Sequence, residues 1–311
     1  MSVENSHKEK SCILLSSFNG EKYLEEQIES LLLQEDVDPK IIIRDDGSAD
    51  KTCAIIRKYT ETKPERVEKI ESTGNVGPTR SFILLLQYAV KSGFDYFFFC
   101  DQDDVWKLDK CKRAIERLQG EEKPALYFSE KCIVDSNLKP LGIQDRIMFS
   151  DTVWDCFTYS NVSGCTMCLN RSLAEKLIRN DFVEKKYLHD AFLYRLSIVM
   201  DATIVYDNCE TMLYRQHGNN VVGSIETRRL TDILDKKTVK KRKHYMRDMF
   251  RDILRLYPDS ILEENKYIVQ FVANYDGNWK RKLGLLWNIM NEDCPSTIKG
   301  KLAIKIILNI L

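Results

Sequence analysis

Residues 95–106, DYFFFCDQDDVW, join an apolar stretch directly to a cluster of acidic residues. An uninterrupted apolar run followed by charge predicts a short strand that is buried on both faces and ends in a polar loop. Two earlier segments repeat this pattern, residues 11–19 (SCILLSSFN) and residues 40–48 (KIIIRDDGS). The three segments therefore predict parallel strands, each ending in polar side chains.

Helical patterns separate these strands and complete an α/β fold. Helices are expected at residues 21–34, 49–59 and 81–90, with one more short strand near residues 67–70. Alternation of strand and helix is typical of a mostly parallel sheet with right-handed crossovers. Ligands bind beyond the carboxyl ends of such strands. The polar clusters are therefore expected to meet along one edge of the sheet.

The second half of the sequence is organised differently. We expect a pair of strands over residues 125–136, a strand and a helix over 161–178, a helix over 189–200 and a strand-rich piece over 202–218. Residues 225–311 are helical in pattern and basic, with 18 Lys and Arg against 11 Asp and Glu, whereas residues 1–224 hold 29 against 36. This asymmetry predicts a domain over residues 1–224 and a basic helical region over 225–311.

Composition limits the class of protein. The 311 residues are 43% apolar and 30% charged, which supports a large core and excludes a disordered chain. Lys and Arg (47) balance Asp and Glu (47), so no nucleic acid partner is indicated. The N-terminus is polar, and no stretch approaches the roughly 20 apolar residues that cross a bilayer. Cysteines within apolar runs indicate reduced thiols and a cytoplasmic protein.

The acidic cluster is the strongest candidate for chemistry. Asp101, Asp103 and Asp104 place three carboxylates within four residues. Like charges this close repel one another unless solvent or a cation compensates, and Mg²⁺ or Mn²⁺ prefers such oxygen ligands. The alternative is that Asp101 or Asp103 caps a helix beginning near Trp106. Three carboxylates favour the metal site.

Other candidates have an ordinary structural explanation beside a functional one. Asp45 and Asp46 either form a turn or accept hydrogen bonds from a base or ribose. Arg80 either is a solvated cation or pairs with a diphosphate. Asp190 either caps a helix or acts as a general base.

Two further candidates involve imidazole and thiol groups. His217 lies in a polar loop, where it either is a surface residue or binds a metal ion. Cys165 and Cys168 have the spacing of a zinc or redox pair, but no second close pair accompanies them, so two buried thiols are favoured.

Together these segments resemble the family 2 glycosyltransferases with the GT-A fold, a Rossmann-like, mostly parallel sheet flanked by helices. The resemblance covers roughly residues 11–223, and the matching strings are LLSSFNGEKYLEEQIESLLLQ, IIIRDDGSADKT, GNVGPTRSF, FFFCDQDDVWKLDK, SGCTM, LHD and YRQHGNNVVG. The strings DQDDVW and YRQHGNNVVG look most like bacterial rhamnosyltransferases of cell-wall or capsular polysaccharide synthesis. The Gln-x-x-Arg-Trp motif of processive synthases is missing, which favours a single addition or a short run.

The resemblance implies a role for each candidate residue. The positions that match the site holding the nucleoside part of a nucleoside-diphosphate-sugar donor are Ser17, Phe18, Asp46 and Arg80, with Asp45 as a substitute for Asp46. Within the acidic motif, Asp101 and Gln102 match donor-binding positions. Asp103 matches the ligand of Mn²⁺ or Mg²⁺, His217 matches a loop that closes over this metal, and Asp190 matches the catalytic base.

The implied activity is an inverting, metal-dependent sugar transfer, with rhamnose from dTDP-rhamnose as the favoured donor and a saccharide or a lipid-linked glycan as acceptor. A non-catalytic nucleotide-sugar-binding protein and a nucleotidyltransferase are the alternatives. A nucleotidyltransferase would more often show a Gly-rich loop with a Lys, which residues 11–24 lack. For residues 225–311 we expect either peripheral contact with the inner face of the plasma membrane or a homodimer interface.

Overall fold

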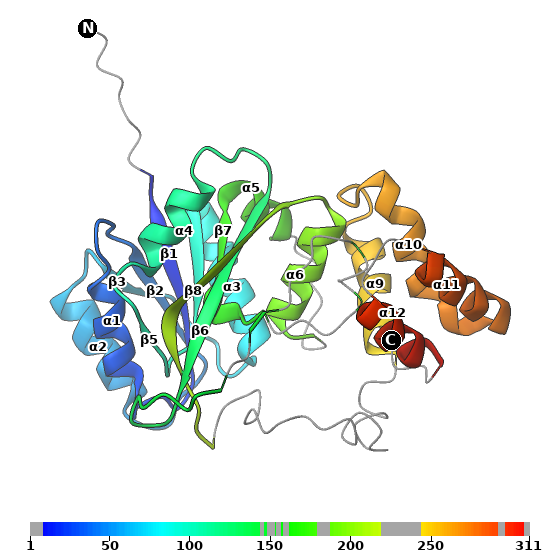
Figure 1. Ribbon diagram of the computed structural model, residues 1–311. Coiled ribbons are helices and arrows are strands. Elements are labelled where there is room, and N and C mark those ends of the chain that lie inside the picture. Colours follow the sequence, from blue (N-terminus) through cyan, green and yellow to red (C-terminus); the bar gives the residue numbers. More distant parts are fainter. Residues whose placement is uncertain are drawn as a thin grey trace, which may run out of the picture.

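The computed structural model describes residues 9–143, 146–147, 153, 157, 162–178, 187–218, 244–291 and 296–307. In these ranges a single sheet is flanked by helices on both faces (Figure 1). The strands are β1 (Ser11–Ser17), β2 (Lys40–Asp45), β3 (Val67–Lys69), β4 (Tyr96–Cys100), β5 (Val105–Trp106), β6 (Ala125–Val134), β7 (Met167–Asn170) and β8 (Thr203–Arg215). The predicted α/β architecture is confirmed.

The sheet has the order β3-β2-β1-β4-β7-β6-β8-β5. Strands β1 to β4 are mutually parallel, β7 runs antiparallel to both β4 and β6, and β8 is parallel to β6. The strand pair expected over residues 125–136 is wrong, because β6 is one long strand. Its register against β8 shifts at Glu130, and this irregularity interrupts the pattern that suggested two strands.

The helices of the first part are α1 (Leu24–Leu32), α2 (Thr52–Thr62), α3 (Pro78–Lys91), α4 (Lys110–Leu118), α5 (Arg171–Leu177) and α6 (His189–Val199). Local sequence explains two of their starts. Pro78 opens α3 at a position where its missing N–H costs nothing. Asn170 caps α5, since its side-chain oxygen accepts a hydrogen bond from the Leu173 N–H (3.0 Å).

The central strands are buried on both faces. Along β1, Cys12 and Leu14 join the core that packs against α3, α5 and α6, whereas Ile13 and Leu15 join the core under α1, α2 and α4. Successive side chains of a strand point to opposite faces, so an uninterrupted apolar strand feeds two cores at once. For this reason the short apolar runs in the sequence predict the central strands of the sheet.

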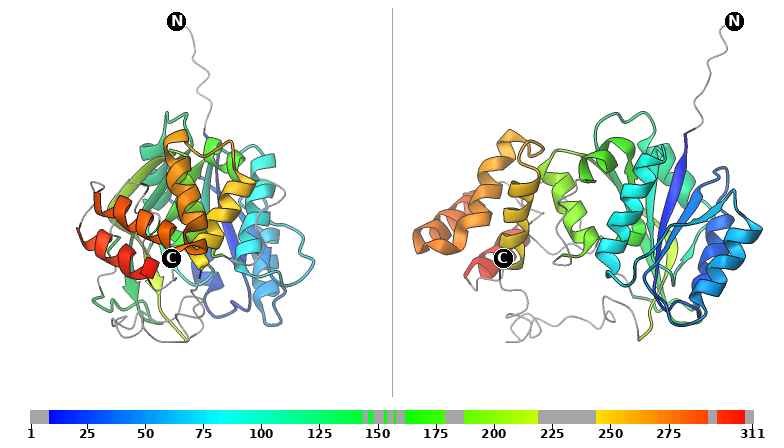
Figure 2. Two further views of the ribbon diagram at one scale, coloured as in Figure 1. Left: turned by 90° about the vertical axis from the view of Figure 1, so that its right-hand side faces the viewer. Right: turned by 180° about the vertical axis from the view of Figure 1, so that it is seen from behind.

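The C-terminal helices are α9 (Tyr245–Leu256), α10 (Glu263–Asn274), α11 (Trp279–Asn291) and α12 (Ser296–Ile307). They lie at the end of the molecule away from β3 (Figure 2). Met249 and Phe250 of α9 belong to the same core as α6, and the Leu262 N–H donates to the Val199 carbonyl (3.0 Å). No helix in the described ranges combines the length and apolarity needed to span a bilayer. The predicted boundary near residue 224 falls outside the described residues.

Candidate active site

The polar strand ends meet along one edge of the sheet, as the sequence predicts. Ser17 at the end of β1 is in register with Asp45 at the end of β2, and Leu15 is in register with Cys100 at the end of β4. Strands β6 and β8 run in the same direction as β4, because two antiparallel pairings separate β4 from β6. The end of β8, Arg215, therefore reaches the same edge.

Asp45 is buried and lies where β2 gives way to the loop before α2. Its carboxylate accepts hydrogen bonds from the Ser48 side chain (2.5 Å), the Ser48 N–H (3.0 Å) and the Ser17 hydroxyl (3.3 Å). Burial by itself raises the pKa of Asp45, but the hydrogen bonds, led by those from Ser48, lower it below its usual value. Asp45 is therefore ionised and held beside Ser17.

Asp46 fixes the loop that leads into α3. Its carboxylate pairs with the buried Arg44 guanidinium (2.6 Å) and accepts the Val76 and Gly77 N–H groups, both at 2.8 Å. Arg80 follows in the first turn of α3, half-buried and without an ion pair to any described residue. The structure thus brings Asp46 to the loop that presents Arg80, and leaves the Arg80 cation unneutralised there.

Phe18 and Gln102 join the ends of β1 and β4. The Phe18 N–H donates to Gln102 Oε1 (2.8 Å), and Gln102 Nε2 donates to the Phe18 carbonyl (3.0 Å). A β-carbon on Gly20 would collide with the Gln102 amide, so only glycine allows this close approach. Gln102 therefore positions the exposed Phe18 ring at the edge of the site.

The acidic cluster is concentrated around Asp101 and Asp104. Ligand atoms of Asp101, Asp104 and Cys165 all lie within 4.8 Å of one another. Burial, together with the negative charges of Asp103 and Asp190, raises the pKa of Asp101 to about 7. Burial, together with the negative charges of Asp103 and Asp101, also raises the pKa of Asp104 well above its usual value. The helix-cap alternative is wrong, because β5 follows the cluster and α4 begins only at Lys110, after Asp109.

Asp103 and His217 are brought into contact from distant parts of the chain. His217 Nε2 lies 2.8 Å from Asp103 Oδ2, and the His217 ring packs on Tyr23 with centroids 5.1 Å apart. Arg215 holds this junction together: its Nε donates to the Asp103 carbonyl (2.8 Å) and its N–H donates to Asp104 Oδ1 (3.0 Å). The structure therefore places His217 against Asp103 of the acidic cluster, and its role as a metal ligand stays a prediction.

Asp190 lies in the first turn of α6, facing the acidic cluster. Leu188, and not Asp190, occupies the N-cap position of this helix, but Asp190 Oδ1 accepts a hydrogen bond from the Ala191 N–H (2.6 Å) within the first turn. Asp190 Oδ2 accepts a hydrogen bond from the Gly164 N–H (3.2 Å), outside its own helix. Its charge is among the causes of the raised pKa of Asp101.

The residue before it, His189, is buried between Phe82 and Phe99. Neither ring nitrogen of His189 has a hydrogen-bond partner. Burial lowers the pKa of His189, while the negative charge of Asp190 acts in the opposite direction. A neutral imidazole therefore packs directly behind the candidate base.

Sequence reasoning missed three buried cations that support this edge, Arg44, Lys110 and Arg215. Lys110 Nζ donates to the Cys165 carbonyl (3.0 Å) and to Thr211 Oγ1 (3.3 Å), beneath the acidic cluster. Burial lowers the pKa of Lys110. No signal marks Lys110, since lysines on a charged helix usually face solvent. Arg44 and Arg215, by contrast, lie at the ends of predicted strands. A charged residue within a predicted buried strand is a signal that could have identified them.

The residues at the cluster fit a hard divalent cation. The ligand atoms of Asp101 and Asp104 lie together, Asp104 Oδ2 is buried without a hydrogen-bond partner, and the neighbouring residue Asp103 contacts the His217 imidazole. Oxygen ligands with one imidazole suit Mg²⁺ or Mn²⁺. Hard cations prefer oxygen to sulfur ligands, so the buried Cys165 thiol beside these carboxylates is not expected to bind such an ion.

Comparison with known proteins agrees with this geometry. The model of the glycosyl transferase family 2 domain matches residues 12–178. The chain is 32% identical, over 221 residues, to a dTDP-rhamnosyl transferase of Shigella flexneri, RfbG; the match covers 68% of this chain and 74% of that protein.

Two solved structures share the fold. TarS of S. aureus, in complex with UDP-GlcNAc, has a TM-score of 0.60 at 16% identity, covering 97% of this chain and 88% of that one. The mannosyltransferase PcManGT of Pyrobaculum calidifontis, in complex with GDP-Man and Mn²⁺, has a TM-score of 0.54 at 13% identity, covering 98% and 82%. The GT-A fold expected from the sequence is thereby confirmed.

Proposed function

Because this chain belongs to glycosyl transferase family 2 and is therefore a glycosyltransferase, we propose that it transfers a sugar from a nucleoside-diphosphate donor with inversion at the anomeric carbon. The observation that carries the proposal is the position of Asp190. Its carboxylate comes from α6, yet it accepts a hydrogen bond from the Gly164 N–H (3.2 Å), and the thiol of the next residue, Cys165, lies within 4.8 Å of ligand atoms of Asp101 and Asp104. The proposed base would thus be adjacent to the proposed diphosphate site.

The proposed reaction is a direct displacement. The acceptor hydroxyl oxygen bonds to the anomeric carbon while the bond from that carbon to the diphosphate oxygen breaks. Asp190 takes the hydroxyl proton, and the nucleoside diphosphate leaves with the electron pair. The hydrogen bond from the Gly164 N–H supports this role because it stabilises and orients the carboxylate.

The donor would lie across the ends of β1, β2 and β4. Ser17, Phe18 and Asp45 would contact the nucleoside, with Asp46 holding the loop that carries Arg80 toward the base or diphosphate. Asp101 and Gln102 would contact the ribose side of the donor. Rhamnose from dTDP-rhamnose is the donor we favour, on the strength of the similarity to the Shigella flexneri protein.

A Mn²⁺ or Mg²⁺ ion would be held by Asp103 and His217, with Asp101 or Asp104 near it. When bound, such an ion neutralises the charge that develops on the departing diphosphate. The chain's own part is to fix the ligands: Arg215 anchors the backbone of Asp103 and the carboxylate of Asp104. Arg80 would add positive charge from the first turn of α3.

The acceptor we propose is a saccharide or a lipid-linked glycan of bacterial surface polysaccharide synthesis. The reaction would take place in the cytoplasm, where all eight cysteines of the described residues can stay free thiols. The C-terminal region would then supply either peripheral contact with the inner face of the plasma membrane or a homodimer interface.

The test is a panel of donors: dTDP-rhamnose, UDP-glucose, UDP-N-acetylglucosamine and GDP-mannose. The full chain is incubated with each donor, Mn²⁺ and a solvent extract of bacterial membranes as the acceptor source. Release of the nucleoside diphosphate by the wild type, and not by Asp190→Asn, supports the proposal. Formation of a nucleoside triphosphate and a sugar 1-phosphate from the donor when pyrophosphate is added would instead indicate a nucleotidyltransferase. Donor binding without turnover under all conditions would indicate a non-catalytic binding protein.

A further inference from the structure

The helix α11 carries large apolar side chains on a face that the protein leaves in solvent. The exposed fractions are 66% for Trp279, 53% for Leu283, 68% for Trp287 and 60% for Met290. On another face of the same helix, Leu285 and Ile289 are buried in the core shared with α6. An amphipathic helix at a protein surface normally presents polar residues to water. The four exposed residues, here called the α11 stripe, therefore need a partner.

Positive charge borders the α11 stripe. With about 100° of rotation per residue, the four side chains fall within an arc of roughly 80°. Lys280 projects beside one margin of this arc and Lys282 beside the other. Neither lysine forms an ion pair with a described residue, and the sequence of α11 contains no Asp or Glu. The surface thus combines indole and aliphatic groups with unneutralised ammonium groups.

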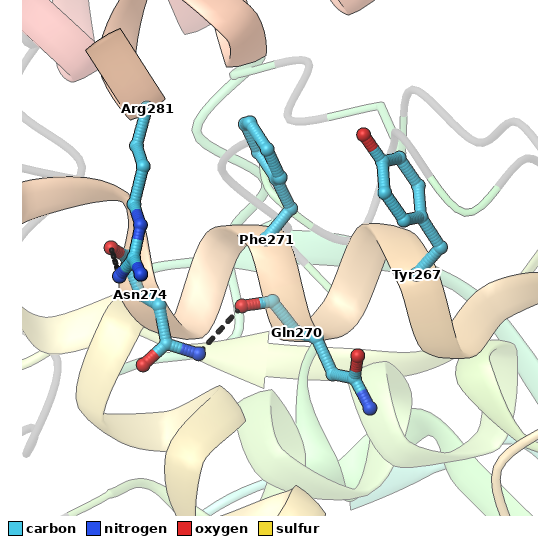
Figure 3. Close-up of a pocket in the computed structure, with 5 residues that line it drawn as sticks. All are labelled: Tyr267, Gln270, Phe271, Asn274 and Arg281. Carbon is cyan, nitrogen blue, oxygen red and sulfur yellow. Dashed lines mark hydrogen bonds between the residues drawn. The ribbon is translucent and has the colours of Figure 1, made fainter.

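Arg281 provides a contrast within the same helix. Figure 3 shows its guanidinium extending toward α10, beside Asn274, where Nη1 donates to the Asn274 carbonyl (3.4 Å). The open cavity of about 390 Å³ that it borders is lined by Tyr267, Gln270 and Phe271 as well. By the same rotation, Arg281 projects from the opposite side of α11 to the stripe. Arg281 is therefore a matched control for the two lysines.

We propose that the α11 stripe binds the surface of an anionic lipid bilayer, with the helix axis lying in the plane of the interface. Tryptophan is suited to this position because its ring is apolar and its N–H can reach water or headgroups. Basic residues next to apolar ones are typical of helices that lie on a bilayer. The helix lies on the membrane rather than crossing it, since Leu285 and Ile289 are packed against protein.

A bilayer suits the stripe better than a second copy of the chain. Lysine is depleted where two proteins bury apolar surface, whereas lysines gain energy near anionic headgroups. A standard protein interface also covers about 800 Å² on each partner, which is more than four side chains on one helix provide. The usefulness of the contact rests on the proposed function, because a lipid-linked acceptor would be held at the same surface. The binding itself requires no transfer.

The experiment measures co-sedimentation of the full chain with vesicles of phosphatidylglycerol and phosphatidylethanolamine, and with vesicles of phosphatidylcholine alone. We expect the wild type to pellet with the anionic vesicles only. The double variant Trp279→Ser, Trp287→Ser should bind them at least ~10-fold more weakly, since it loses the apolar part of the contact. Lys280→Gln with Lys282→Gln should weaken binding several-fold and reduce its sensitivity to salt. Arg281→Gln should bind like the wild type.

Several outcomes would overturn the proposal. The first is that the wild type stays in the supernatant when anionic vesicles are sedimented. The second is that the double tryptophan variant pellets as the wild type does. A concentration-dependent dimer in light scattering that the tryptophan substitutions abolish, without vesicle binding, would assign the stripe to a second copy instead. Circular dichroism is used to check that each variant is folded. Release of nucleoside diphosphate without vesicles tests the proposed function separately, because the stripe contains no residue of the candidate active site.

Discussion

His217 Nε2 lies 2.8 Å from Asp103 Oδ2, although 114 residues separate the two along the chain. The contact exists because β4 and β8 run in the same direction and end at the same edge of the sheet. Arg215, the last residue of β8, binds the backbone of Asp103 and so sets where the next residues can go. An imidazole nitrogen and a carboxylate oxygen at this distance are suited to bind one divalent cation between them, in place of their direct contact.

Replacing Asp103 with Ala is expected to abolish nearly all sugar transfer while leaving the fold intact. His217→Ala should weaken Mn²⁺ binding by about 10- to 100-fold, because it removes the nitrogen ligand but leaves the carboxylates. Mn²⁺ binding is measured directly by titration calorimetry, and transfer is measured by release of nucleoside diphosphate. Full activity of the wild type in excess chelator would contradict the metal assignment.

Asp190→Asn tests the proposed base without changing its shape. The amide oxygen can still accept one of the two N–H groups that the carboxylate binds, those of Gly164 and Ala191, so circular dichroism is used to verify that α6 is preserved. We expect kcat to fall by roughly 10² or more, with the dissociation constant of the donor near that of the wild type. Donor affinity comes from fluorescence titration and kcat from initial rates. Wild-type turnover by the Asn variant would exclude Asp190 as the base.

Gly164 and His189 form a steric pair behind this base. A β-carbon on Gly164 would collide with Nε2 of His189, and the ring cannot retreat because Phe82 packs against it (ring centroids 4.3 Å apart). Gly164→Ala should therefore destabilise the protein by about 1–3 kcal/mol and lower kcat, since the Gly164 N–H also orients Asp190. Urea unfolding measures the first effect and initial rates the second.

The double variant Gly164→Ala, His189→Ala supplies the control for that pair. Removing the imidazole creates space for the new methyl group, so Gly164→Ala should cost much less in the His189→Ala background than in the wild type. The difference between the two costs is the coupling energy of the pair. Equal costs in both backgrounds would show that the collision is not what limits residue 164 to glycine.

The sequence predicted those parts of the fold that depend on local pattern. The apolar runs ending at Ser17, Asp45 and Cys100 identified three parallel strands, and their common direction predicted the edge at which the site lies. The single strand β6 was misread because its register shift at Glu130 breaks the local pattern. Such a shift is set by pairing with β8, which is distant in sequence.

The candidate site, like the fold, could be predicted only where the signal is local in the sequence. Asp101, Asp103 and Asp190 were found because acidic residues stand out next to apolar segments. The role of Lys110 could not be found, because its burial depends on contacts with Cys165 and Thr211 that only the folded chain creates. Cys165 was expected to be a buried thiol paired in spacing with Cys168, yet it lies against the acidic cluster. Spacing within a sequence cannot reveal which cluster a buried side chain adjoins.

Acid sensitivity of the fold should arise in part from Asp207, a fully buried carboxylate of β8. It accepts hydrogen bonds from Arg113 Nε (3.0 Å), the Tyr127 hydroxyl (2.9 Å) and the Cys209 N–H (3.1 Å), and it forms an ion pair with Arg117. Burial acts to raise the pKa of Asp207, but the hydrogen bonds and the arginines together lower it below its usual value. The lowered pKa stabilises the fold at pH values above the ordinary carboxyl range, and this stability is lost as the pH falls through the folded-state pKa.

Asp207→Asn is therefore expected to lower the free energy of unfolding at neutral pH by about 2 kcal/mol, a figure kept modest because both arginines are partly solvated. The difference in the free energy of unfolding between the wild type and Asp207→Asn should shrink as the pH falls from 7 toward 3. Over this range the wild type loses the stability that depends on the charge of Asp207, and the variant has no such charge. Urea unfolding at a series of pH values measures both effects. Asp36→Asn is the matched control, because it removes an exposed carboxylate paired with Lys112 on the same helix α4 as Arg113, and should change stability by less than ~0.5 kcal/mol. Unfolding curves of the wild type and Asp207→Asn that keep a constant separation from pH 7 to pH 3 would contradict the assignment.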